Sequence, residues 1–268
     1  VLYLGRIVRD PFGDRIRLQE GITIRQWDPV TGEDTELWDP FDFLDPINDR
    51  TQRSDLIRAD KFCGQTVNIR RDWMHANSLD VAAEGNVIMS VRHTNQIISI
   101  APDFQSLQWR LGDARHLGKP TSDFTFPDPS DQFYHQHSAK LLSNGNMLLF
   151  DNGNTRPEQE GGLYSRALEL ELHFGKMEAR KVWEYRHTQD LYARCCSNVT
   201  RLANGNTAVM FGADGSTDRC CRVFTLVEAD AQGDAVAVIE IRAPGKAQQY
   251  RAYPVDSIFG ESATGEFA

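Results

Sequence analysis

The feature that most constrains this chain is an internal repeat of about sixty residues. Three segments align without gaps, and each contains a Gly-Asn pair, namely Gly85-Asn86, Gly145-Asn146 and Gly205-Asn206, at intervals of 60 residues. In each copy an alternating run precedes the pair, and a run rich in Val, Ile, Leu and Met follows it. This pattern predicts a tight β-hairpin with the Gly-Asn pair in its turn.

Each copy continues with two further strand-like runs, so the repeat unit predicts four strands. The third strands are expected at 96–102, 167–172 and 222–229, and the fourth at 107–113, 181–185 and 235–241. An earlier half unit is expected at 21–29 and 33–39, around the turn Val30-Thr31-Gly32. Trp38, Trp109 and Trp183 occupy matching places near the end of the last strand. The segment from Asp45 to Ala59 is expected to hold a short helix.

Repeated four-stranded antiparallel units of this size predict an all-β fold, a β-propeller whose blades surround a central axis. The 268 residues hold about four to five blades at about sixty residues each. We therefore expect one propeller domain over residues 1–268, which is either compact or part of a six-bladed ring that lacks its first blades. Val1 in place of an initiator methionine favours the second alternative.

Composition excludes two classes of partner. The formal net charge is −9, which argues against nucleic acid because duplex binding requires a cationic face. The sequence contains no run of apolar residues long enough to span a membrane. Neither a Walker-type phosphate loop nor a dinucleotide-binding glycine motif is present. We therefore expect no cofactor.

Propeller geometry places the segment before the first strand and the segment after the second strand of every blade at one mouth of the central channel. The Gly-Asn turns then lie on the opposite face. The polar residues expected at the mouth are His75, Asn77, Arg92, His93, His135, His137, Asp151, Asn152, Arg156, Cys195, Cys196, Ser197, Asp214, Asp218, Arg219 and Cys220. Because the repeats align, His75, His135 and Cys195 are equivalent. Four of the seven histidines of the chain fall in this set.

Several strings in the sequence resemble the arylsulfotransferase family. These strings are DWMHANSLD (72–80), SVRH (90–93), QHSAKLLSNGNMLLFDNG (136–153), YSRALELEL (164–172), KVWEY (181–185) and YRAYPV (250–255). They occur in the order and phase of the repeat, and the resemblance covers about residues 20 to 256. The combination of strings is specific, whereas each string alone is a weak signal.

The resemblance implies a six-bladed propeller that transfers a sulfuryl group from a phenolic sulfate ester to a phenol, without a nucleotide donor and through a sulfated histidine. It implies that His75, His137 and Arg156 are catalytic residues that bind or polarise the sulfuryl oxygens. Asn77, Arg92, His93 and Asn152 are the expected substrate-binding residues. Export to the periplasm or outside the cell is also compatible with the resemblance, although the sequence alone does not assign a compartment.

The chain departs from the family pattern at one place. The resemblance implies a nucleophilic histidine in the loop after the second strand of the next blade, which here runs from Phe211 to Cys221 and contains no histidine. A low-pKa thiol beside Arg194 or Arg219 is an alternative nucleophile. Disulfide bonds between the Cys195-Cys196 and Cys220-Cys221 pairs are the other interpretation of these cysteines.

The chemistry of the residues agrees with an anionic substrate. Arginine offers a planar fork for oxygens that share negative charge, and a neutral imidazole acts as a nucleophile or an acid-base group near neutral pH. A backbone-bonding role for His75 and His137, and an ion pair of Arg156 with Asp151, are the structural alternatives. A metal site is not expected, although His75, His135 and Cys195 together are a geometric option.

Three functions remain open from the sequence. The first is an aryl-sulfate sulfotransferase-like enzyme. The second is a catalytically silent propeller that binds an anionic small molecule at the same mouth, and the third is a protein-interaction scaffold. We favour the enzyme, because the histidines and the arginine fall on one face in the phase of the repeat.

Overall fold

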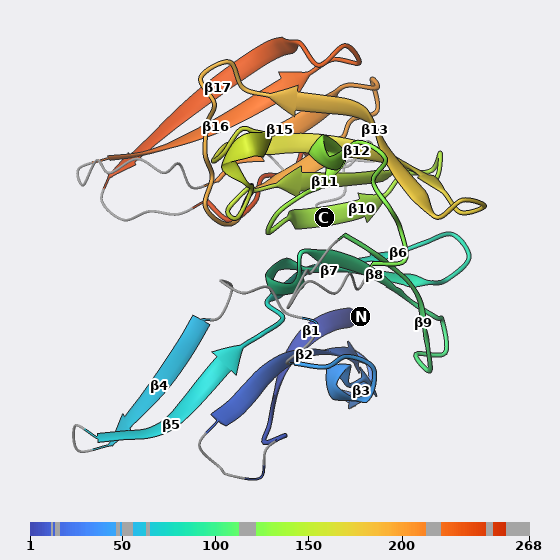
Figure 1. The fold of residues 1–268 in the computed structure, drawn as a ribbon, viewed down its shortest axis with the longest axis vertical. Helices are drawn as coiled ribbons and strands as arrows, with labels where there is room; N and C mark the ends of the chain where they lie inside the picture. Colours follow the sequence, from blue (N-terminus) through green and yellow to red (C-terminus); the bar gives the residue numbers. More distant parts are fainter. Residues whose placement is uncertain are drawn as a thin grey trace.

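The computed structural model describes residues 1–11, 13, 17–46, 49, 56–62, 65–112, 122–212, 221–244 and 249–255. Three of its sheets are four-stranded antiparallel meanders that follow one another along the chain (Figure 1). Their strands are β6 (Ala76–Val81), β7 (Val87–Val91), β8 (Gln96–Ile100) and β9 (Leu107–Leu111); β10 (His137–Leu141), β11 (Met147–Asp151), β12 (Arg166–His173) and β13 (Glu178–Arg186); and β14 (Asn198–Arg201), β15 (Thr207–Phe211), β16 (Cys221–Ala229) and β17 (Ala235–Pro244).

The predicted repeat is confirmed at the level of single residues. The second strand of each meander begins at Val87, Met147 and Thr207, again 60 residues apart. The turn before each of these strands contains a glycine with φ of 91°, 85° and 89° at Gly85, Gly145 and Gly205. Glycine is required there because a side chain disfavours this left-handed backbone. The sequence therefore predicted both the hairpins and their turns, and the sheets are the blades of a β-propeller.

The N-terminal sheet differs from the other three. It contains β1 (Leu2–Arg9), β2 (Arg17–Trp27), β3 (Asp34–Trp38), β4 (Leu56–Phe62) and β5 (Gln65–Asp72), in the order β1-β2-β5-β4 with β3 paired to β2. The expected half unit is confirmed, since β2 and β3 pair antiparallel around the turn at residues 30–32. β2 and β5 run parallel, however, so this sheet is not a simple meander.

The expected helix from Asp45 to Ala59 is wrong where the structure can be compared with it, because Leu56 to Ala59 belong to β4. Within the described ranges the helical elements are four short 3-10 turns. They are η1 (Pro40–Asp42), η2 (Arg92–Thr94), η3 (Pro129–Asp131) and η4 (Glu158–Glu160). Two of these turns, η2 and η4, follow the second strand of a blade and shape the segments at the predicted mouth.

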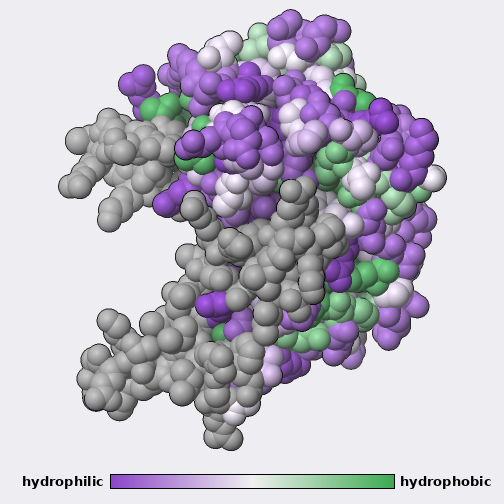
Figure 2. Space-filling view, viewed as in Figure 1, coloured by the Kyte–Doolittle hydropathy of each residue, from purple (hydrophilic) through white to green (hydrophobic). Residues whose placement is uncertain are grey.

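The core lies between successive sheets, which stack face to face in Figure 1. Every residue of β7, β8 and β11 is buried, and most of these residues are apolar, as is typical of strands covered on both faces. Trp38, Trp109 and Trp183 are all buried, each in the last strand of its unit, as the matching sequence positions predicted. The described part of the face in Figure 2 is mostly hydrophilic, as expected where the sheets turn their apolar faces toward one another.

A buried ionic network fixes the end of β11. Asp151 is fully buried, and its carboxylate accepts hydrogen bonds from Arg156 Nη2 at 2.6 Å and from Arg166 Nε at 3.0 Å. Arg166 also donates to the carbonyls of Ser130 and Gln132, at 2.8 and 2.9 Å. A buried carboxylate is stable as an anion only when donors of this kind surround it.

We expect Arg166→Met to lower the free energy of unfolding by about 3 kcal/mol, because it leaves Asp151 with one guanidinium and two carbonyls without a donor. Urea denaturation measures the loss. The matched control is Arg180→Met, which removes a largely exposed ion pair with Glu178 and should cost less than about 1 kcal/mol. Equal effects of the two substitutions would contradict a structural role for the network.

Candidate functional site

The site begins at the end of β5, where Asp72 and His75 form a local pair. The Asp72 carboxylate accepts the His75 backbone amide at 3.0 Å and lies 2.5 Å from His75 Nδ1. His75 has a φ of 51°, a left-handed conformation that the Asp72 turn stabilises. Asp72 is almost completely buried, whereas the His75 side chain is 37% exposed. One face of the His75 imidazole therefore remains accessible.

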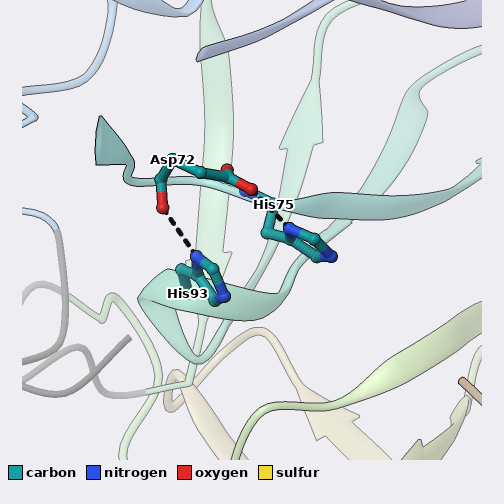
Figure 3. Close-up of side chains that lie close together, drawn as sticks. All are labelled: Asp72, His75 and His93. Atoms are coloured by element: carbon teal, nitrogen blue, oxygen red, sulfur yellow. Dashed lines mark hydrogen bonds and ion pairs between the residues drawn. The ribbon is translucent and has the colours of Figure 1, made fainter. Parts of the chain in front are cut away.

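Asp72 also orients a second imidazole. His93 lies in η2, is buried, and donates from Nδ1 to the Asp72 carbonyl oxygen at 2.7 Å. The two rings stack with centroids 4.7 Å apart and an angle of 27° between their planes. In Figure 3 their second nitrogens point away from Asp72. One residue thus directs two imidazoles the same way, through its carboxylate and through its carbonyl.

The charges of these groups are set by burial. Burial, followed by the positive charges of Arg92 and His75, lowers the pKa of His93 to about 3. Burial also opposes ionisation of Asp72, but the hydrogen bond from His75 and the charges of both histidines outweigh it and hold the pKa of Asp72 below its usual range. At neutral pH the cluster therefore contains a carboxylate and a neutral His93.

His135, just before β10, and His137, the first residue of β10, complete the set of imidazoles. The His135 amide donates to Asn95 Oδ1 at 2.8 Å, and its ring lies 6.1 Å from the His93 ring. His137 Nδ1 donates to the Ser197 carbonyl at 2.7 Å. Burial is the main cause that lowers the pKa of His135 well below its usual value and that of His137 to about 3. Both rings are neutral at physiological pH.

Arginine side chains make this region electropositive. Arg92 donates from Nη2 to the Arg194 carbonyl at 3.0 Å, and its charge contributes to the lowered pKa values of His93, His135 and His137. Arg251 donates from Nη2 to the carbonyl of Asn77, on the first strand of the β6–β9 sheet. A positive field that disfavours protonated imidazole favours a bound anion.

A metal ion is a less suitable ligand for this region than an anion. Asp72, His75 and His93 place potential ligand atoms within 4.8 Å of one another. Among the described residues they are the one cluster of three possible metal ligands. The Nδ1 atoms of both rings are already bonded to Asp72, however, and the charge of Arg92 opposes a cation as it opposes protonation of His93. The sequence option of His75, His135 and Cys195 does not form such a group in the described ranges.

The predicted amides are buried and serve the backbone. Asn77 donates to the Gln136 carbonyl at 2.9 Å and accepts from the Ser138 amide at 3.1 Å, which ties the β6–β9 sheet to the next one. Asn152 donates to the Ala193 carbonyl at 2.6 Å. These bonds are structural, and the substrate-binding roles expected for both residues stay predictions.

Arg156 lies in the ionic network and makes no contact with the imidazoles in the described structure. Its side chain is fully buried, pairs with Asp151, and lies between the rings of Tyr134 and Tyr164, at 5.4 and 4.1 Å from their centroids. This is the ion pair that the sequence left open as the alternative. Its Nε and Nη1 have no hydrogen-bond partner among the described residues. The expected role of Arg156 toward sulfuryl oxygens stays a prediction.

Sequence reasoning missed Asp72 as a functional residue. Its signal is an aspartate three residues before a histidine at the start of a hairpin, a spacing at which the carboxylate can accept the histidine's backbone amide. Tyr250 was also missed, although it lies in one of the resembling strings. Its ring meets the ring of His137 edge to face at 5.1 Å. The expected loop for a nucleophile at 211–221 lies mostly outside the described residues.

Comparison with known proteins identifies the family of the chain. The family model described as Arylsulfotransferase (ASST) matches residues 18–253. The chain belongs to the arylsulfotransferase family. It is 30% identical over 178 residues to an arylsulfate sulfotransferase AssT of Escherichia coli, which covers 54% of this chain and 28% of that protein. It is 24% identical over 232 residues to the AssT of Lelliottia amnigena, covering 69% of this chain and 38% of that protein.

The arylsulfotransferase match leaves much of the relatives' length outside this chain, which spans less than two fifths of each of the two relatives. A solved streptogramin B lyase has 10% sequence identity and a TM-score of 0.36 over 90% of this chain and 72% of that one. In the ranges that the structure describes, no helix is long and apolar enough to cross a membrane.

The buried imidazoles predict a dependence of stability on pH. The folded pKa values of His93 and His137 lie near 3, below the ordinary 6.5. The unfolded chain therefore binds more protons than the folded chain between these values. We expect the free energy of unfolding to fall as the pH falls below about 6.5, by up to about 1.4 kcal/mol per pH unit for each histidine.

Urea denaturation between about pH 5 and 7 measures this slope. His137→Asn should reduce the slope by about a third, because it removes one of the three buried neutral imidazoles, His93, His135 and His137. His173→Gln, at the exposed end of β12, keeps all three buried imidazoles and should retain the slope of the unmodified protein. A slope that His137→Asn leaves unchanged would show that His137 is charged in the folded protein.

Proposed function

We propose that this protein transfers a sulfuryl group from an aryl sulfate to a phenol, with His75 as the nucleophile. The observation that carries the proposal is the Asp72–His75 pair, in which a buried carboxylate holds Nδ1 of an accessible imidazole. The family membership supports the reaction class. The absence of a histidine from 211–221 leaves the nucleophile to another residue.

The Asp72–His75 pair has the arrangement that activates an imidazole. When Nδ1 donates its hydrogen to a carboxylate, the other ring nitrogen, Nε2, keeps its lone pair. Attack by Nε2 on the sulfur forms the N–S bond and breaks the S–O bond to the aryl group, and the electron pair leaves with the phenolate. The ring becomes positively charged, and the Asp72 carboxylate stabilises this charge. The acceptor phenol then attacks the sulfur and releases Nε2.

A neutral histidine is suited to accept a hydrogen bond from the hydroxyl group of the acceptor phenol. His137 donates from Nδ1 to the Ser197 carbonyl oxygen, so Nε2 of its ring is a hydrogen-bond acceptor. An acceptor phenol can donate its O–H to such an atom. An anionic ester bound beside this ring also raises its pKa, because an opposite charge nearby favours the protonated form. Substrate binding thus makes an imidazole a better base for the phenol proton.

Positive side chains fit the sulfate ester. Arg92 is the predicted substrate-binding residue whose charge reaches three of the imidazoles, and its Nε has no hydrogen-bond partner among the described residues. We assign Arg92 to binding of the sulfuryl oxygens, where a donor aimed at developing charge lowers the barrier. The second function, a silent anion-binding propeller, uses the same charge without the attack of His75.

The test is incubation of the purified protein with a chromogenic aryl sulfate, with and without a phenol. We expect phenol release that the acceptor accelerates, and mass spectrometry should find a sulfuryl adduct on His75. His75→Asn should abolish both. The control is His173→Asn, at the exposed end of β12, which should retain the activity. Saturable ester binding without turnover or adduct would select the silent propeller.

Asp72→Asn tests the pair separately. It keeps the shape of the side chain but removes the charge that stabilises the sulfated imidazolium, so we expect kcat to fall by about 10²-fold or more. Thermal denaturation of the same variant separates this effect from unfolding. A variant that is folded and retains full turnover would rule out the pair as the nucleophilic unit.

A further inference from the structure

The vicinal thiols Cys195 and Cys196 lie beside the imidazole cluster and have no role in the proposed transfer. Both are free thiols; Cys195 is half-buried and Cys196 is buried. Cys196 Sγ donates to Cys195 Sγ at 3.4 Å. The side chains of Cys220 and Cys221, the partners considered from the sequence, lie outside the described residues.

From this geometry we propose that Cys195 and Cys196 form a reversible redox site. Hydrogen peroxide oxidises Cys195, and the thiol of Cys196 then closes a vicinal disulfide. This disulfide alters the hydrogen bond that orients His137. Such a site needs an accessible thiolate with a resolving thiol in contact. The 3.4 Å contact and the partial exposure of Cys195 provide both.

The surroundings favour a thiolate at Cys195. The hydrogen bond from Cys196 and the positive charges of Arg92, Arg194 and His75 lower the pKa of Cys195, and burial opposes them only in part. The pKa of Cys196 is raised by its bond to Cys195, by burial and by the negative charge of Cys195. The pair therefore divides its roles, with Cys195 as the attacking sulfur and Cys196 as the protonated partner.

The reaction balances with peroxide as the oxidant. The Cys195 thiolate attacks one peroxide oxygen, so an S–O bond forms, the O–O bond breaks, and hydroxide leaves. Sulfur loses two electrons and the peroxide gains them. Oxidised Cys195 is neutral, which removes the charge that kept Cys196 protonated; Cys196 gives its proton to hydroxide and attacks the sulfur of Cys195. The S–S bond forms, the S–O bond breaks, and hydroxide leaves and is protonated to water.

A disulfide between adjacent residues is strained. Consecutive Cα atoms are about 3.8 Å apart, whereas disulfides usually join Cα atoms about 4.4 to 6.8 Å apart. Strained disulfides are more easily reduced, which is typical of regulatory bonds. The same contact explains why Cys195 is a poor choice for the sulfuryl nucleophile. A sulfuryl group on Cys195 would be displaced as sulfite by Cys196, before any phenol received it.

The backbone after the pair connects it to the site. Cys196 and Ser197 are both left-handed, with φ of 63° and 81°. The Ser197 carbonyl holds His137 Nδ1 at 2.7 Å, and the Ser197 amide donates to the Tyr250 carbonyl at 3.0 Å. Closing the pair requires the two sulfurs to approach from 3.4 Å, which rotates the peptide next to Ser197. The hydrogen bond that orients His137 lies one residue from this change.

Peptide mapping tests the site on the unmodified protein. Trypsin cuts after Arg194 and Arg201 and releases a peptide with Cys195 and Cys196 as its only cysteines. After a mild peroxide treatment we expect this peptide to lose two hydrogens and resist alkylation, and dithiothreitol should restore it. Before oxidation, iodoacetamide at neutral pH should label Cys195 before Cys196. Thiols that both remain open to alkylation, or a bond from either one to Cys63, Cys220 or Cys221, would overturn the proposal.

Turnover of the aryl sulfate supplies the functional readout, which rests on the proposed function. We expect peroxide to lower turnover severalfold and dithiothreitol to restore it. Cys196→Ser should lose the recovery, because its sulfenic Cys195 has no vicinal thiol to close a disulfide and a second peroxide oxidises it to sulfinic acid, which dithiothreitol does not reduce. Cys63→Ser is the matched control and should respond like the unmodified protein. If the reduced protein has no turnover, the proposed function fails, and the peptide map still decides the thiol site. A vicinal disulfide without any effect on turnover would overturn its link to His137.

Discussion

Burial of both faces of the inner strands is the constraint on which the rest of this structure depends. β7 and β11 are covered on each side by a neighbouring sheet, so nearly all of their side chains are apolar. The exceptions, Ser90 and Asp151, lie in the last two residues of these strands, and charged side chains gather at the strand ends. The segments that enter and leave these strands carry the histidines, arginines and cysteines, and the fixed repeat brings them from distant parts of the sequence to the same end.

Two buried aspartates at these strand ends have different roles. Asp151 faces two guanidinium groups, of Arg156 and Arg166, and its carboxylate is occupied by these fixed charges. Asp72 faces two imidazoles, one of them accessible. An ion pair between fixed charges stabilises the fold, whereas a carboxylate beside an imidazole stabilises a charge that appears during a reaction. The first aspartate belongs to the scaffold and the second to the chemistry.

The sequence predicted the blades because their signals are local. The Gly-Asn turns and the alternating runs recur every 60 residues, and the strands follow them closely. The parallel pairing of β2 with β5 was not predictable in this way, because it joins segments separated by some fifty residues without a shared motif. The expected helix at 45–59 failed in its last part, since Leu56 to Ala59 form an edge strand against β5.

The sequence predicted which residues gather at the site better than it predicted what each residue does there. The repeat phase indicated His75, His93, His135 and His137 together. It did not indicate that His93 and His135 are fully enclosed, because burial at a strand end depends on the neighbouring sheets. Asp72 was missed since its role arises from a backbone turn at His75. The pairing of Arg156 with Asp151 was open from the sequence, because a short separation permits the contact without requiring it.

The left-handed residues before each blade show how far the repeats are interchangeable. His75 and His135 are equivalent and have φ of 51° and 55°, whereas in the next blade the left-handed position falls on Cys196, one residue later than the alignment predicts. A side chain at 195 therefore leaves the backbone in a different direction from the two histidines. A histidine introduced at 195 by mutation would add an imidazole, but its ring would not point in the direction of the His75 or His135 ring. Grafting chemistry between these blades requires moving the turn together with the residue.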